Sequence, residues 1–83
     1  MGSSGTVQLK DVWKMLAHCA PGYTARPTKH HWRIAFGGRT YPSLPLGAHG
    51  RRENPLIEIG HVKRMARFLG ILDCAKTALP ALQ

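Results

Sequence analysis

Acidic residues are scarce in this chain. Its 83 residues include 4 Asp and Glu against 12 Lys and Arg, which leaves a formal net charge of +8. So large an excess of one sign on a short chain predicts an anionic partner: a nucleic acid, a membrane surface or an acidic protein. Arg outnumbers Lys, and the guanidinium group makes forked contacts with phosphate, so the composition favours nucleic acid.

Long apolar runs are also missing. No stretch is long enough to cross a membrane, and no charged segment followed by an apolar one suggests a secretion signal. We therefore expect a soluble cytoplasmic protein with no membrane partner. The first five residues, Met-Gly-Ser-Ser-Gly, are typical of an expression-tag remnant, and we expect residues 1–5 to be disordered or to lie outside the fold.

Cysteine occurs only twice. Cys19 and Cys74 lie far apart in the sequence among apolar neighbours, and we expect two reduced, partly buried thiols rather than a disulfide. The chain has no Cys-x-x-Cys pair, and its five histidines lack companion ligands at metal spacing. The sequence therefore predicts no metal site and no cofactor.

The apolar periodicity predicts two main helices. Apolar residues recur at helical spacing over 9–19, with Thr6 as a possible cap, and again over about 60–69. Gly70 followed by Ile71 is typical of the residues that close a helix in a Schellman motif. The remaining residues, 72–83, are expected to form a tail, and Asp73 is a possible cap for one more short helix. No internal repeat is evident.

Two or three antiparallel strands are expected between the helices. Residues 23–28 contain a proline and predict at best an edge strand, residues 31–36 alternate, and residues 39–44 form the returning strand. Gly37-Gly38 is a strong signal for a two-residue hairpin. The order predicts an α+β fold, an antiparallel sheet covered by two helices on one face.

The alternation of residues 31–36 assigns side chains to the two faces of this sheet. Trp32 and Phe36 belong to the apolar face, where we expect them to pack in the core. His31 and Arg33 then share the open face. Residues 46–54, which are rich in Gly, Arg and Asn, predict a mobile loop.

The adjacent histidines His30 and His31 are the candidate catalytic residues. Strand alternation would send the two side chains to opposite faces. Imidazole changes its protonation state near neutral pH, so either group can take a proton from a ribose 2′-hydroxyl or protonate the leaving 5′-oxygen. Lys29 and Arg33 would hold a phosphate beside it. The alternative is that both are ordinary strand residues, one partly buried and one solvated.

Basic side chains spread over the predicted sheet, the loop and the second helix. The alternative to a nucleic-acid footprint is a solvated basic surface, and we prefer the footprint because these elements can share one side of the molecule. The candidate RNA-binding residues are Arg26, Lys29, Arg33, Arg39, His49, Arg51, Arg52, Lys63 and Arg64.

The order of these motifs resembles a known family. The features that carry the resemblance are the first helix, Gly22-Tyr23, Arg26, His30-His31, Gly38-Arg39, Pro45 with His49, and the helical sequence over 59–71. This pattern is similar to that of the HicA toxins, also called YcfA-like mRNA interferases. The resemblance covers residues 9–71 and implies a single HicA-like domain over 6–71, with an α-β-β-β-α fold like that of double-stranded RNA-binding domains.

The resemblance also implies an activity. HicA toxins cleave mRNA independently of the ribosome with one catalytic histidine on the sheet, and a HicB antitoxin inhibits them. The histidine carries over to His30 or His31, and the acidic HicB-type antitoxin becomes an expected partner. In the family a Gly-Ser step usually precedes the histidine, whereas this chain has Thr28-Lys29 there.

Three functions therefore follow as hypotheses. The leading one is a metal-independent endoribonuclease that cleaves mRNA by histidine general acid–base catalysis, as the toxin of a toxin–antitoxin pair. The second is a non-catalytic RNA-binding module on the same fold, which recognises shape and phosphates and needs no titrating histidine. The third is an accessory domain that docks an acidic protein through the same basic face.

Overall fold

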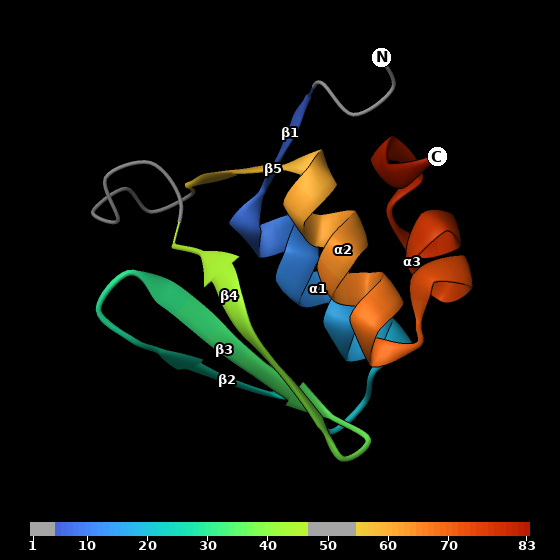
Figure 1. Ribbon diagram of the computed structural model, residues 1–83. Coiled ribbons are helices and arrows are strands. Elements are labelled where there is room, and N and C mark those ends of the chain that lie inside the picture. The colour runs from blue at the N-terminus through green and yellow to red at the C-terminus, as the bar shows by residue number, and fades with distance from the viewer. Residues whose placement is uncertain (1–4, 47–54) are drawn as a thin grey trace.

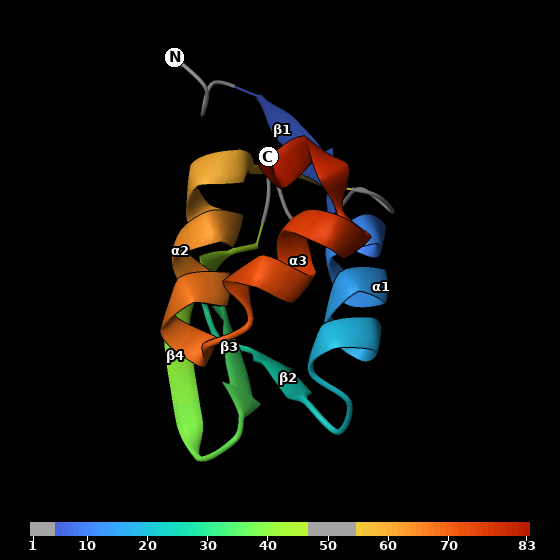
Figure 2. The same cartoon turned by 90° about the vertical axis from the view of Figure 1, so that its right-hand side faces the viewer.

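The computed structural model describes residues 5–46 and 55–83 (Figure 1). A three-stranded sheet lies against the helices α1 and α2, and the short helix α3 lies across both on the side away from the sheet (Figure 2). In chain order the elements are β1 (Thr6–Gln8), α1 (Leu9–Cys19), β2 (Thr24–Pro27), β3 (His31–Phe36), β4 (Arg39–Pro45), β5 (Leu56–Glu58), α2 (Ile59–Leu69), α3 (Leu72–Ala78) and the 3₁₀ turn η1 (Pro80–Leu82).

The larger sheet confirms the predicted meander. Its order is β2-β3-β4 and both pairings are antiparallel. Gly37 and Gly38 connect β3 and β4 with φ of 61° and 82°. A two-residue turn that matches the twist of the strands needs positive φ at both positions, which glycine adopts without steric cost.

A bulge interrupts the pairing of β3 with β4. Ile34 pairs with Tyr41 and Trp32 pairs with Leu44, so Pro42 and Ser43 together oppose Arg33. A proline cannot donate to a ladder, and an edge strand at a bulge is where a sheet tolerates it. The extra residue in the bulge lets Tyr41 and Leu44, which are three positions apart, face the helices together. Both side chains are buried.

The second sheet was not expected from the sequence. It is a two-stranded ribbon in which β1 pairs antiparallel with β5. Thr6 therefore belongs to a strand rather than to a helix cap, and Gln8 at the N-cap position of α1 makes no side-chain capping bond. Strands of three residues carry too little periodicity to be detected alone.

The ribbon relates two similar units. Leu9 N–H donates to Pro55 O over 2.9 Å, and Ile59 N–H donates to Gly5 O over 3.0 Å. The two donors, Leu9 and Ile59, are 50 positions apart, and so are the two acceptors, so each bond is the counterpart of the other. Val7 and Ile57, which pair with each other, are also 50 positions apart. Each strand leads directly into an 11-residue helix. The expectation of no internal repeat is thus wrong: β1–α1 and β5–α2 form a pseudo-twofold pair.

Equivalent core positions follow the same shift. The pairs are Val7 and Ile57, Leu9 and Ile59, Val12 and Val62, and Met15 and Met65, and all eight side chains are buried. Together with Ile34, Tyr41 and Leu44 of the sheet they form one core. Trp32 and Phe36 pack against it, as expected. The helices thus cover one face of the β2-β3-β4 sheet and leave the other open.

The end of α2 is as predicted. Gly70 is left-handed with φ of 78°, and the N–H of Ile71 donates to Ala66 O over 2.9 Å, which closes a Schellman motif. The chain then forms α3. Asp73 lies inside its first turn and makes no capping bond. Residues 72–83 are not a free tail, because Ala75 and Leu82 are fully buried.

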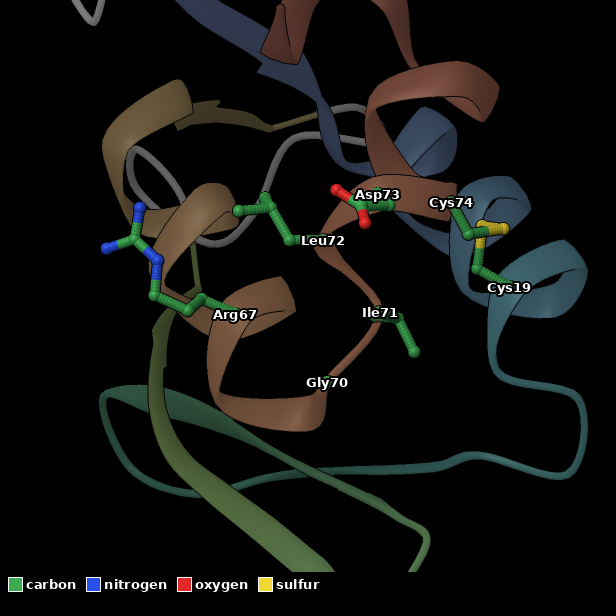
Figure 3. A pocket seen from close by; sticks show the side chains of 7 residues that line it. All are labelled: Cys19, Arg67, Gly70, Ile71, Leu72, Asp73 and Cys74. Carbon is green, nitrogen blue, oxygen red and sulfur yellow. A yellow bond between two sulfur atoms is a disulfide. The ribbon is translucent and has the colours of Figure 1, made fainter.

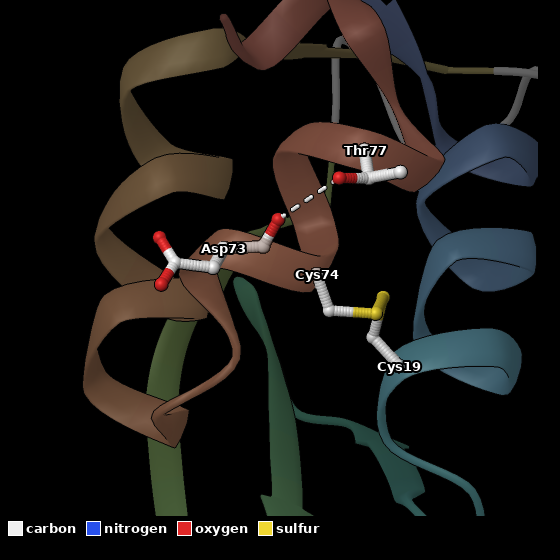
Figure 4. Close-up of a disulfide and its surroundings, with 4 residues drawn as sticks. All are labelled: Cys19, Asp73, Cys74 and Thr77. Carbon is white, nitrogen blue, oxygen red and sulfur yellow. Dashed lines mark hydrogen bonds between the residues drawn. A yellow bond between two sulfur atoms is a disulfide. The ribbon is translucent and has the colours of Figure 1, made fainter.

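The two cysteines form a disulfide, which corrects the expectation of reduced thiols. Cys19 ends α1 and Cys74 lies in the first turn of α3, with 5.7 Å between the two Cα atoms (Figure 4). The sequence separation of 55 residues conceals this proximity, which arises only when α3 folds back across α1. No helix in the described part of the chain is long and apolar enough to span a bilayer.

Candidate functional site

The open face of the three-stranded sheet carries a cluster of exposed basic side chains. Along β3, His31 and Arg33 are exposed whereas Ile34 is fully buried, so the predicted alternation is confirmed for these residues. On the edge strand β2, Arg26 pairs directly with Arg33. We call Arg26, Arg33 and His31 the basic triad.

Two like charges directly opposite each other on one face of a sheet are unfavourable. A neighbouring carboxylate would normally offset such a pair, but the sequence has no acidic residue between Asp11 and Glu53. The whole β2-β3-β4 sheet is therefore without a carboxylate of its own. Within residues 5–46 and 55–83 the one contact between a basic and an acidic side chain lies elsewhere, where His61 Nε2 is 3.4 Å from Glu58 Oε1. The open face therefore carries an excess of positive charge within the sheet.

Thr28 positions His31 at the start of β3. The N–H of Thr28 donates to His31 O over 2.7 Å, and its hydroxyl lies 3.0 Å from the same oxygen and 3.2 Å from the N–H of His31. The hydroxyl can donate to the carbonyl oxygen of His31 and accept from its N–H. The Thr28 side chain thereby provides His31 with the kind of hydrogen bonds that a paired strand would provide. Sequence reasoning missed this role, although Thr is a usual residue for such local bonds.

His30 does not occupy the position that strand alternation predicts. It lies with Lys29 in the bend between β2 and β3, before the strand begins, and both side chains are exposed. Neither histidine of the pair is therefore buried, whereas strand alternation predicted that one of them would point inward. The ring centroids of His30 and His31 are 6.5 Å apart, with the planes nearly perpendicular.

Arg39 lies apart from the basic triad. Its Nη1 donates to Phe68 O over 2.9 Å, which directs the side chain toward the end of α2 on the covered side of the sheet. A positive charge at a helix C-terminus is favourable because the last carbonyls carry partial negative charge. The tertiary structure thus gives this predicted RNA contact an internal partner.

The remaining candidates divide between α2 and residues outside the described chain. Lys63 and Arg64 lie on α2, which packs beside β4 on the covered side, so they do not share the open face. Lys63 is half-buried and Arg64 is exposed. The predicted loop over 46–54 falls mostly on residues that the structure does not describe, and His49, Arg51 and Arg52 all belong to them.

A groove lies elsewhere, along the end of α2 and the start of α3, and it reaches Cys19 at the end of α1. Its volume is about 530 Å³, and its lining includes Arg67, Gly70, Asp73 and both disulfide-bonded cysteines (Figure 3). It is separated from the open sheet face by the helical layer. Among the described residues no three His, Cys, Asp or Glu side chains gather closely enough to hold a metal ion.

Comparison with known proteins adds no relative. No protein-family model, no curated protein and no solved structure matches this chain. The established description is therefore a small α+β fold with an antiparallel sheet, helices on one face of it, and a basic triad on the other.

Proposed function

We propose that this protein is an endoribonuclease that cleaves mRNA on the open face of the β2-β3-β4 sheet, as the toxin of a toxin–antitoxin pair. One observation carries the proposal: Arg26 and Arg33 lie directly opposite each other beside exposed His31, on a sheet that has no carboxylate. A phosphodiester satisfies the two guanidinium groups and lies next to an imidazole.

The reaction we propose uses the ribose as nucleophile. Neutral His31 takes the proton of the 2′-hydroxyl, whose oxygen attacks phosphorus while the bond to the 5′-oxygen breaks. Protonated His30, with its ring centroid 6.5 Å away, gives its proton to the leaving 5′-oxygen. The products are a 2′,3′-cyclic phosphate and a 5′-hydroxyl. Arg26 and Arg33 stabilise the charge that develops on the phosphoryl oxygens.

The order of elements supports the proposed family. When β1 and β5 are set aside, the chain runs α1-β2-β3-β4-α2, the α-β-β-β-α order of double-stranded RNA-binding domains, and α3 and η1 follow as additional elements. The same basic face supports an acidic antitoxin of the HicB type as the partner. Such a protein would cover the face with carboxylates that the sheet itself lacks, and would exclude RNA from it.

The test is cleavage of a long mRNA by purified protein in EDTA. We expect the wild type to cleave the RNA into fragments that end in 2′,3′-cyclic phosphate. We expect the His31→Ala variant and the double variant Arg26→Gln/Arg33→Gln to lose this cleavage. His18→Ala is the matched control, because His18 is an exposed histidine on α1, away from the sheet. Fragments with 3′-hydroxyl ends, or equal cleavage by the His31 variant, would contradict the mechanism.

A non-catalytic RNA-binding module is the second candidate. It is favoured by the exposure of both His30 and His31, since an imidazole in open solvent does not need a reaction to explain it. A module of this kind would bind the same RNA through Arg26 and Arg33 and leave it intact. Filter binding and cleavage measured on one sample separate the two functions: retained RNA of unchanged length would favour the module.

A further inference from the structure

The C-terminal segment 72–83 makes its recorded hydrogen bonds locally. In the described structure, Ala75 N–H donates to Ile71 O, Gln83 Nε2 donates to Lys76 O, and the other bonds of the segment also stay within residues 71–83. Its attachment to α1 and α2 therefore depends on apolar packing and on one covalent link. The packing includes the fully buried side chains of Ala75 and Leu82.

The covalent link is open to small molecules. Cys19 and Cys74 are each partly exposed, and both line the groove along the end of α2 and the start of α3 (Figures 3 and 4). The groove has a volume of about 530 Å³ and is open to solvent. A disulfide that reagents can reach is the kind that exchanges with thiols, whereas a fully enclosed one is protected from them.

We propose that Cys19–Cys74 is a site of thiol–disulfide exchange with a low-molecular-weight thiol, and that its reduction releases the segment 72–83 from α1 and α2. A thiolate attacks one sulfur of the pair, the S–S bond breaks, and the other cysteine leaves as a thiolate that takes a proton from water. A second thiolate then attacks the small-molecule sulfur of the mixed disulfide, and the protein cysteine leaves as a thiolate that is protonated in turn. The net change converts two thiols into their disulfide and the protein disulfide into two cysteines.

Release is local because of where the segment lies. None of its residues pairs with a strand or bonds to the backbone of α1 or α2 in the described structure, so it can leave without breaking those interactions. Helix α3 has seven residues, and an isolated helix of that length does not persist in water. The sheet and the β1–β5 ribbon keep their own pairings. The reduced protein is therefore expected to keep its main fold while segment 72–83 is unfolded.

Hydrogen exchange followed by mass spectrometry tests the proposal on the intact protein. The oxidised protein is compared with protein incubated in millimolar reduced glutathione, and free thiols are counted by alkylation. We expect both cysteines to be alkylated, and the amides of α3 to exchange at least about tenfold faster while those of β3 and α2 change little. Cys19→Ser/Cys74→Ser should exchange like the reduced protein whether or not glutathione is present.

Three results would overturn the proposal. The cysteines could remain oxidised in glutathione and so escape alkylation, which would show that the disulfide does not exchange with this thiol. Reduction could leave the exchange of α3 unchanged, which would show that apolar packing alone holds the segment. Exchange could also accelerate equally in α2, β3 and α3, and the disulfide would then stabilise the whole fold instead of one segment.

Discussion

Arg26 and Arg33 form a direct cross-strand pair of like charge on the open face of the sheet. The pair has no acidic residue within the sheet, so no carboxylate of the sheet offsets the repulsion between the guanidinium groups. This relationship does not help the protein to fold. It is therefore the feature that a functional explanation has to address first.

Removing one charge of the pair is expected to separate binding from stability. Arg33→Gln should lower RNA affinity and reduce the magnitude of the salt dependence of binding by about one phosphate contact. Its free energy of unfolding should stay within about 0.5 kcal/mol of the wild type, or rise, because repulsion is relieved. Binding titrations at several salt concentrations and urea unfolding measure the two effects. Arg64→Gln, an exposed arginine on α2, is the matched control.

A loss of affinity in Arg64→Gln as large as that in Arg33→Gln would count against the open face. It would show that RNA responds to the overall charge of the protein instead of to the basic triad.

Thr28 should control the geometry of His31. Thr28→Val keeps the shape of the side chain but removes the hydroxyl that lies 3.0 Å from His31 O and 3.2 Å from its N–H. We expect a loss of about 1 kcal/mol in unfolding free energy, and lower cleavage at unchanged RNA affinity if His31 reacts. Thr28→Ser retains the hydroxyl and should behave like the wild type. Equal behaviour of the Val and Ser variants would exclude this positioning role.

Arg39 should matter for stability more than for RNA. Arg39→Met keeps the aliphatic part of the side chain and removes the donor to Phe68 O. We expect the unfolding free energy to fall by about 1–2 kcal/mol, since a charged hydrogen bond at a helix C-terminus is lost. Urea denaturation measures the change, and Arg39→Lys, which keeps the charge, should lose less. A stable Arg39→Met variant with strongly reduced RNA affinity would instead place Arg39 in the interface.

The pseudo-twofold relation predicts similar contributions from equivalent methionines. Met15 and Met65 are 2% and 0% exposed at matching positions of α1 and α2. Each substitution by alanine should lower the unfolding free energy by about 2–5 kcal/mol. Thermal and urea unfolding of the two variants check this. A large effect for one methionine and a negligible effect for the other would show that the two units are alike in pattern and not in packing.

The sequence predicted much of the local structure. The spacing of apolar residues located α1 and α2, Gly37-Gly38 located the hairpin, and Gly70-Ile71 located the end of α2. Each of these signals comes from residues close together in the chain. Alternation along β3 likewise placed His31 and Arg33 on one face, because the side-chain period of a strand is a local property.

Features that depend on distant residues were missed or wrongly predicted. Strands β1 and β5 are recognisable only through their pairing with each other, which spans most of the chain. The disulfide was wrongly excluded because the sequence separates its cysteines by 55 residues. The sequence places Arg39 with the other basic residues on elements that can share one side of the molecule, whereas its bond to Phe68 O depends on the packing of α2 on the sheet.

The sequence by itself determined the charge of this protein, the periodicity of its helices and the face of β3 on which His31 lies, because these properties are set by composition and by neighbours within a few positions. Only the tertiary structure decided that Arg26 pairs with Arg33, that Cys19 bonds to Cys74, and that β1–α1 and β5–α2 form a pseudo-twofold pair. Those relationships join residues that are distant in the sequence and come into contact only when the helices pack on the sheet and on each other.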